Sequence, residues 1–382
     1  MASSDHRPTG VLGTRRADRL SGTVRREAHP GGPRAVIVSK DQIVSLHTFD
    51  GVQRYQFLPN QQFNLEWSRE LRQVSTCNLG VPSTLDYNRL PDIVPWRDWI
   101  SVFDSEGDEL LWSGPILVVD ADRGSMNISS RDVSNYLSRT RCPLTKAWDA
   151  SDPATIAGEL WRACIEFHGL QTAIIEKLDP LGDRFDYEVE ADTQMVDQVI
   201  GDLVGLGLRW TVSNGVPILG PVGLKPVAAL GEEHFIGGGL RLTRDGSQMA
   251  NDVLLRTADT NTARAILPTG GLRLQSIVDR DSMFDISNAE RAVQQYVRHT
   301  GKIQDTVTVP GGSVLHPDAP VSIDQLVPSA RVTVEAFGLL TMMELTKVQV
   351  QTTTGGEAKV SVDMAAVDDD LPELLEKPEG KL

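Results

Sequence analysis

The chain contains 382 residues, and at about 150 residues per domain this length predicts two or three domains. Its formal net charge of −15 disfavours a nucleic-acid reader or a protein that binds an anionic membrane, because both need a basic surface. No run approaches the roughly 18 apolar residues of a membrane span, and the N-terminus has no apolar signal core. The sequence therefore predicts no membrane span and no export by a visible route.

Cysteine and tryptophan are the residues whose surroundings the composition helps to predict. The cysteines Cys77, Cys142 and Cys164 are odd in number and include no CxxC pair, so we expect reduced, buried thiols. Aromatic residues make up only 5% of the chain, so each tryptophan is expected to anchor a separate packing site. The tryptophans are Trp67, Trp96, Trp99, Trp112, Trp148, Trp161 and Trp210.

Residues 1–34 are predicted to form an arginine-rich N-terminal arm. Seven arginines against three acidic residues give it a charge of +4 and leave −19 on the rest of the chain. The composition fits either a disordered leader or an arm that orders against an acidic neighbour in an assembly. The arginines are Arg7, Arg15, Arg16, Arg19, Arg25, Arg26 and Arg34.

Residues 35–145 are predicted to form a first β-barrel-like domain. Short β-like runs alternate with turn signals such as Asp50-Gly51 and Pro59-Asn60. The first predicted strands are Ala35–Ser39, Ile43–Phe49, Tyr55–Leu58, Phe63–Trp67 and Leu71–Leu79.

The stretch Trp96–Arg141 contains the most closely spaced predicted elements of this domain. A strand at Trp99–Phe103 runs into the polar turn Asp104–Gly107, which is a hairpin signal. Leu110–Trp112 resumes the strand pattern, and Ser113-Gly114-Pro115 predicts a break in it. The elements predicted after the break are a strand at Ile116–Val119, a turn at Asp122–Gly124, a strand through Met126 and Ile128, and a short helix from Asp132 to Arg139.

Residues 146–235 are predicted to form a small α/β domain. Asp152-Pro153 is typical of a helix N-cap followed by proline at the first helical position. A second helix is predicted from Asp192 to Leu206, and a hairpin follows at Leu208–Val212 and Val216–Leu219.

Residues 236–367 are predicted to form a second β-barrel-like domain, and residues 368–382 a solvated acidic tail. The run Ser287–Glu290 fits the capping box of one helix, which Gly301 would end. Clear alternation then predicts three strands, the last two joined by a turn at Thr353–Gly356. The three strands are Arg331–Phe337, Thr346–Gln351 and Lys359–Met364.

The sequence contains no strong catalytic or ligand-binding motif, so we predict no catalytic, cofactor-binding or metal-binding residues and no cofactor. Cys164 and His168 stand four apart on a predicted helix, but structural zinc needs four ligands. The acidic stretch Asp179–Asp192 does not follow the pattern of a calcium loop. Glu232-Glu233-His234 lacks a second histidine, and Gly237-Gly238-Gly239 precedes strands, which favours a hinge over a phosphate cradle. Paired carboxylates of a glycoside hydrolase stay an open alternative.

Two segments carry a resemblance to a known family. They are WISVFDSEGDELLWSGPILVVDAD in the first β domain and DTVTVPGGSVLHPDAPVSIDQL, followed by three alternating strands, in the last. Over roughly residues 36–366 the order of β domain, α/β domain and β domain resembles the tail hub proteins of long-tailed phages. Those proteins are similar to the baseplate hubs of contractile tails and to type VI secretion spike hubs.

The resemblance implies a non-enzymatic structural protein at the phage tail tip. It implies a homotrimer whose two similar β-barrels per chain present six barrels to the hexameric tail tube, so that the hub closes or adapts the tube and guides DNA exit. Implied partners are the distal tail or tail tube proteins, the tape measure protein and other tail tip proteins, in a virion assembled in the host cytoplasm. A receptor- or cell-wall carbohydrate-binding tail protein and a tail-associated cell-wall hydrolase stay as alternatives.

Overall fold

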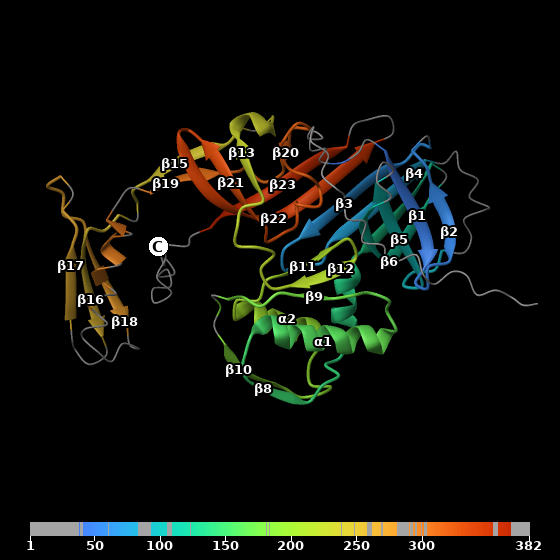
Figure 1. The fold of residues 1–382 in the computed structure, drawn as a ribbon, viewed down its shortest axis with the longest axis horizontal. Helices are drawn as coiled ribbons and strands as arrows, with labels where there is room; N and C mark the ends of the chain where they lie inside the picture. The colour runs from blue at the N-terminus through green and yellow to red at the C-terminus, as the bar shows by residue number, and fades with distance from the viewer. Residues whose placement is uncertain are drawn as a thin grey trace, which may run out of the picture. The chain divides into compact units, whose positions relative to one another are not determined.

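The protein is mainly β, as the sequence predicts. The computed structural model describes Val38 and residues 41–367, apart from residues 83–92, 105–108, 258–261, 281–289 and 354–357 and some isolated positions. The described elements all belong to one unit, Ala35–Leu382 (Figure 1). The predicted arm 1–34, the tail 368–382 and the predicted strand Ala35–Ser39, apart from Val38, lie outside the described residues.

The first β region confirms most of the predicted strands. Its elements are β1 (Gln42–Thr48), β2 (Gln53–Phe57), β3 (Asn64–Glu70), β4 (Thr76–Pro82), β5 (Asp98–Asp104), β6 (Glu109–Ala121), β7 (Ser125–Arg131) and the 3₁₀ helix η2 (Val133–Arg139). The strand predicted at Leu71–Leu79 is wrong in its first half, because residues 71–73 form bends and residues 74–75 are irregular. There the N–H groups of Leu71 and Arg72 donate to Thr346 and Trp210 outside β4, and Arg72 has a positive φ of 59°.

The predicted break at Ser113-Gly114-Pro115 is wrong, because these residues lie inside strand β6. The strand runs through these residues without interruption, but it exchanges its partner there. Residues up to Pro115 pair with β5, and residues from Ile116 onward pair with β7. Because proline has no N–H to donate to a ladder, it suits the point where one pairing ends and the next begins.

The α/β region has its own core, which the two predicted helices fill. Its elements are β8 (Lys146–Ser151), α1 (Pro153–His168), β9 (Ile175–Glu176), β10 (Phe185–Val189), α2 (Val196–Gly205), β11 (Trp210–Ser213) and β12 (Val216–Leu219). Asp152 caps α1 as predicted, and Gly169 ends it in the left-handed conformation. Helix α2 begins later than predicted, because Asp192 has a φ of 63°, which no helix admits.

The last region contains the three alternating strands predicted from the sequence. Its elements are β13 (Ala228–Gly231), η3 (Glu232–His234), β14 (Phe235–Ile236), β15 (Arg241–Asp245), β16 (Asp252–Thr257), β17 (Thr262–Ile266), β18 (Gln275–Arg280), β19 (Gln304–Thr308), β20 (Ser313–Leu315), β21 (Arg331–Ala336), β22 (Leu339–Thr353) and β23 (Lys359–Ala366). Most of the predicted turn Thr353–Gly356 and of the capping box Ser287–Glu290 lies outside the described residues.

An inserted module lies between β15 and β19, and the sequence did not predict it. β15 and β19 pair with each other, and the chain between them forms a separate sheet in the order β17-β16-β18. Helical residues between 290 and 300 pack Val293 and Val297 onto one face of that sheet, with Val253 and Leu255. The module therefore has its own small core.

The two β regions share one sheet and one core. The long strand β22 pairs with β21 along its first half and with β3 along its second half, while β23 pairs along its other edge (Figure 1). A single hydrophobic cluster includes Leu65 and Trp67 of β3 together with Val348 and Val350 of β22. The predicted division into domains 35–145, 146–235 and 236–367 stays a prediction, but the first and last of these ranges are continuous in hydrogen bonding.

Candidate functional site

Arg69 lies at the point where the three regions meet. It belongs to β3, and the alternation of Leu65 and Trp67 turns its side chain into the core, where it is fully buried. One terminal nitrogen, Nη1, donates to the carbonyl oxygens of Ile323 at 2.8 Å and Leu326 at 3.3 Å. These contacts join the first β region to the last.

The second terminal nitrogen of Arg69 contacts strand β6 and the α/β region. We call the surroundings of the Arg69 guanidinium, where the three regions meet, the joint. Nη2 donates to the carbonyl oxygen of Leu111 in β6 at 3.1 Å and to Asn214 Oδ1 at 2.6 Å. Asn214 lies at the turn of the β11–β12 hairpin, where its φ is 54° and that of Gly215 is 73°. A single guanidinium therefore connects the first β region, the α/β region and the last β region.

The charge of Arg69 is held without a direct carboxylate partner. Burial lowers its pKa to about 10, and the charge of Asp324 opposes this shift, so the group stays protonated at neutral pH. The guanidinium carbon lies 5.2 Å from the centre of the Trp67 ring, a cation–π contact. A planar fork with several donors suits such a site, because it satisfies several acceptors at once.

Further polar contacts surround this joint. Thr211 Oγ1 donates to the carbonyl oxygen of Glu70 at 2.8 Å, which ties β11 to β3. Arg209 Nε lies 2.9 Å from Glu344 Oε1, and Lys347 Nζ lies 3.0 Å from Glu70 Oε1. The joint is thus held by hydrogen bonds and ion pairs between regions that are far apart in sequence.

A second buried charge, Asp132, organises the start of η2. Its carboxylate accepts from the N–H of Ser75 at 2.8 Å and from the N–H and hydroxyl of Ser134. Burial raises the pKa of Asp132 to about 6, although the hydrogen bonds from Ser134 and Ser75 pull it down. This carboxyl group links the start of β4 to η2.

Stability should depend on pH through Asp132. Its pKa is higher in the folded protein than in the unfolded chain, where an aspartate titrates near about 4. The contribution of protonated Asp132 to the free energy of unfolding is therefore fully present below about pH 4 and is lost as the pH rises through 6. Its upper limit is ~3 kcal/mol. We expect the wild type to lose stability relative to Asp132→Asn across that window, measured by urea unfolding at successive pH values.

Asp122 offers a control of opposite sign for this measurement. The N–H groups of Gly124 and Ser125 lower its pKa at an exposed turn, so Asp122→Asn should change the pH dependence only below about pH 4. Identical pH profiles for the wild type and Asp132→Asn would contradict the assignment.

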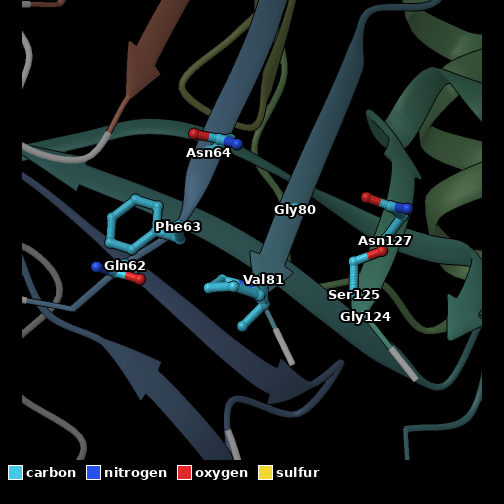
Figure 2. Close-up of a pocket in the computed structure, with 9 residues that line it drawn as sticks. Gln62, Phe63, Asn64, Gly80, Val81, Gly124, Ser125 and Asn127 are labelled. Atoms are coloured by element: carbon cyan, nitrogen blue, oxygen red, sulfur yellow. The ribbon is translucent and has the colours of Figure 1, made fainter. Parts of the chain in front are cut away.

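A polar hollow of about 400 Å³ lies at the ends of β3, β4 and β7. Figure 2 shows Gly80 between Asn64 and Asn127, and a Cβ at Gly80 would lie 3.3 Å from Asn127 Oδ1. Gln62 and Ser125 add further hydrogen-bonding groups, and the described lining residues include no side chain that titrates. The hollow can bind through hydrogen bonds, but these residues offer no acid or base for catalysis.

The structure brings Cys164 and His168 together through Thr140. The Thr140 hydroxyl lies 3.3 Å from Cys164 Sγ and 2.8 Å from His168 Nε2. Burial raises the pKa of the Cys164 thiol and lowers that of His168, so the thiol stays neutral and the pair is unsuited to nucleophilic chemistry. The prediction of reduced, buried cysteines is confirmed for all three residues.

The other candidate groups are engaged with the protein itself. Asp179 lies 3.6 Å from Arg209, Asp192 lies 3.0 Å from Arg141, and Asp186 accepts from the N–H of Ala150. Within the part of the chain that the structure describes, no group of three or more histidine, cysteine, aspartate or glutamate residues could hold a metal ion. The same residues contain no helix long and apolar enough to cross a membrane. The absence of site residues stays a prediction.

The tryptophans are packing residues, but the prediction that each anchors a separate site is wrong, because Trp161 and Trp210 share one core and their ring centres lie 6.5 Å apart. Trp67, Trp112, Trp148, Trp161 and Trp210 are buried in the two large cores. The remaining pair, Trp96 and Trp99, is half-buried and packs around Tyr136, with ring centres 5.3 and 6.2 Å away. A flat, exposed row of tryptophans, as a carbohydrate-binding surface would need, is not formed.

The arrangement of strands matches that of known tail proteins. The 43 kDa tail protein of prophage MuSo2 from Shewanella oneidensis is similar in structure, with a TM-score of 0.54 and 14% sequence identity over 86% of this chain and 98% of that one. A tail protein from Neisseria meningitidis MC58 is similar with a TM-score of 0.50 and 14% identity over 86% and 97%. No family model and no curated protein sequence matches the chain. At this level of identity the likeness establishes the fold, and the chain has the fold of these phage tail proteins.

Proposed function

We propose that the protein is a structural hub of a phage tail tip. The likeness to two tail proteins along nearly their whole length is the observation that carries the proposal. We further propose a homotrimer in which the two β regions of each chain present six similar faces to the hexameric tail tube, as the sequence resemblance implies. The proposed neighbours are a distal tail or tail tube protein and the tape measure protein.

The joint around Arg69 supports this role. A subunit that adapts a threefold ring to a sixfold tube needs its two β regions in a fixed relation. The β3–β22 pairing and the four hydrogen bonds of Arg69 provide such a connection. A net charge of −15 per chain would also keep DNA from sticking to the wall of a central channel.

The mass of the purified protein in solution tests the trimer. Three copies of the 41.8 kDa chain give about 125 kDa by sedimentation equilibrium, and negative-stain images should show a ring with a central hole. A stable monomer without rings over the micromolar range would contradict the trimer. Immunogold labelling of purified virions tests the location separately, and label away from the tail tip would contradict the hub role.

A further inference from the structure

The two faces of the inserted module's sheet differ in exposure among the described residues. Helical residues and the core around Val293 cover one side. On the other side the register places Leu254 of β16 beside Arg264 of β17 and Ile277 of β18. Ile277 is 57% exposed, and Leu272, in the loop before β18, is 64% exposed. Such apolar exposure on a pleated face is typical of a surface that binds protein.

Arginines accompany these apolar side chains. Arg264 Nε lies 2.7 Å from Asp252 Oδ1 and neutralises that carboxylate, which also accepts from Gln275. Arg273 lies close enough to contribute to the lowered pKa of Asp252, after the larger effects of Arg264 and Gln275. We call the surface of Arg264, Arg273 and Ile277 the module face.

The segment of the sequence that contains the module carries no net charge. Residues 246–301 carry six arginines against six acidic residues, while the whole chain has a net charge of −15. Two copies that each carry this net charge repel each other. Contact is least costly where one of the meeting surfaces is neutral or basic.

The turn of the β21–β22 hairpin forms a second unusual surface. Phe337 and Gly338 make the turn with positive φ values of 53° and 73°. Phenylalanine is a poor residue for this conformation, which glycine or asparagine adopts readily, and Phe337 is nevertheless 50% exposed. Leu340, the next outward-facing residue, is 71% exposed. The chain thus retains an exposed aromatic residue at a cost in backbone strain.

Glutamates surround this turn. Glu335 lies directly opposite Leu340 in the hairpin and opposite Gly231 on its other side. Glu232 accepts from the N–H of Phe337 at 2.9 Å, and Glu233 lies in the same hollow of about 400 Å³. We call the surface of these three glutamates with Phe337 and Leu340 the hairpin-tip face.

The two faces are complementary in both polarity and charge. The module face offers isoleucine beside arginines, and the hairpin-tip face offers phenylalanine and leucine beside glutamates. We propose that the module face of one copy binds the hairpin-tip face of the next. A contact between two different surfaces of the same chain is head-to-tail, and it closes into a ring when the rotation is right. This inference rests on the proposed trimer and assigns one of its contacts.

Matched aspartate substitutions test the two faces. Ile277→Asp and Leu340→Asp should each weaken the trimer by at least about tenfold, measured by sedimentation equilibrium. The controls are Leu178→Asp and Phe167→Asp, at side chains that are 57% and 70% exposed on the α/β region and should leave the mass unchanged. Circular dichroism of each variant shows whether the fold persists.

A charge exchange tests whether the two faces meet each other. Arg273→Glu and Glu335→Arg should each weaken assembly by about tenfold, and the chain that carries both should recover most of the loss. Additive losses in the double variant would overturn the pairing of these two faces.

Phe337→Gly separates assembly from stability. Glycine relieves the strained turn, so the free energy of unfolding of the monomer, measured below the concentration at which trimers form, should not fall, while trimer formation should weaken by at least about tenfold. A destabilising change could not produce this combination. A Phe337→Gly protein that assembles like the wild type would overturn the role of the hairpin-tip face.

The outcomes of these experiments distinguish a failure of the assigned contact from a failure of the proposed hub function. A wild type that stays monomeric contradicts the proposed trimer itself. A trimeric wild type whose Ile277→Asp and Leu340→Asp variants remain trimeric leaves the hub proposal standing and overturns only the assignment of the contact.

Discussion

Replacement of Arg69 by methionine is expected to lower the free energy of unfolding by about 4 kcal/mol. Methionine fills much of the volume but donates nothing, so the acceptors at Leu111, Asn214, Ile323 and Leu326 lose their donor. Each acceptor that stays buried without a donor costs roughly 1–3 kcal/mol, and partial hydration limits the sum. Urea unfolding followed by tryptophan fluorescence measures the loss.

Two further variants define the cause of that loss. Arg131→Met removes an exposed arginine from β7 and should change stability by no more than about 0.5 kcal/mol. Arg69→Lys keeps a positive charge but places its donors on one nitrogen, which cannot occupy the positions of both Nη1 and Nη2. A lysine variant as stable as the wild type would show that charge alone holds the joint.

Replacement of Gly114 by alanine is expected to cost about 3 kcal/mol or more, although it adds one methyl group. A Cβ at this position would lie 2.0 Å from the carbonyl oxygen of Arg131 and 2.8 Å from the Cα of Asp132. Both atoms belong to the backbone, so no side-chain rotation can relieve the overlap. Strands β6 and β7 would have to separate where β6 exchanges partners.

Gly201 provides the matched control for this substitution. It lies exposed in helix α2, and a Cβ there would meet nothing within 4 Å. Gly201→Ala should therefore stabilise the protein by up to about 1 kcal/mol, because alanine favours the helix over the unfolded chain. Thermal unfolding of the two variants should show shifts of opposite sign, and a shift of the same sign would contradict the steric argument at Gly114.

The sequence predicts the local elements well where one physical signal dominates. The pair Asp152-Pro153 predicts the start of α1, and the alternation in Arg331–Phe337 predicts β21. Both signals lie within or next to the element itself, and both elements form where expected. The Ser113-Gly114-Pro115 break is wrong because its glycine serves a distant contact with β7, which no local pattern contains. The inserted module escaped prediction because its boundary is the pairing of β15 with β19, two strands far apart in sequence, which no local pattern contains.

The joint at Arg69 could have been suspected from one signal. Leu65, Trp67 and Arg69 alternate in β3, and the period places an arginine among inward-facing residues. What the alternation does not contain is the set of acceptors, since Leu111, Asn214 and Ile323 come from three other parts of the chain. The two faces of the proposed contact could not be predicted either, because the sequence alone does not show which of their side chains are exposed.

The pairing of β3 with β22 also decides when the protein can finish folding. Gln349 donates to Glu66 at 2.6 Å across these strands, yet the two residues are 283 positions apart. At roughly 5–20 residues per second, a ribosome needs about 15–60 s to make the chain between them. Throughout that time the nascent chain carries an open strand edge beside Trp67, the kind of edge that recruits other chains. A copy truncated before β22 would keep this unpaired edge permanently. We therefore expect truncated copies to associate with other chains more readily than the full chain.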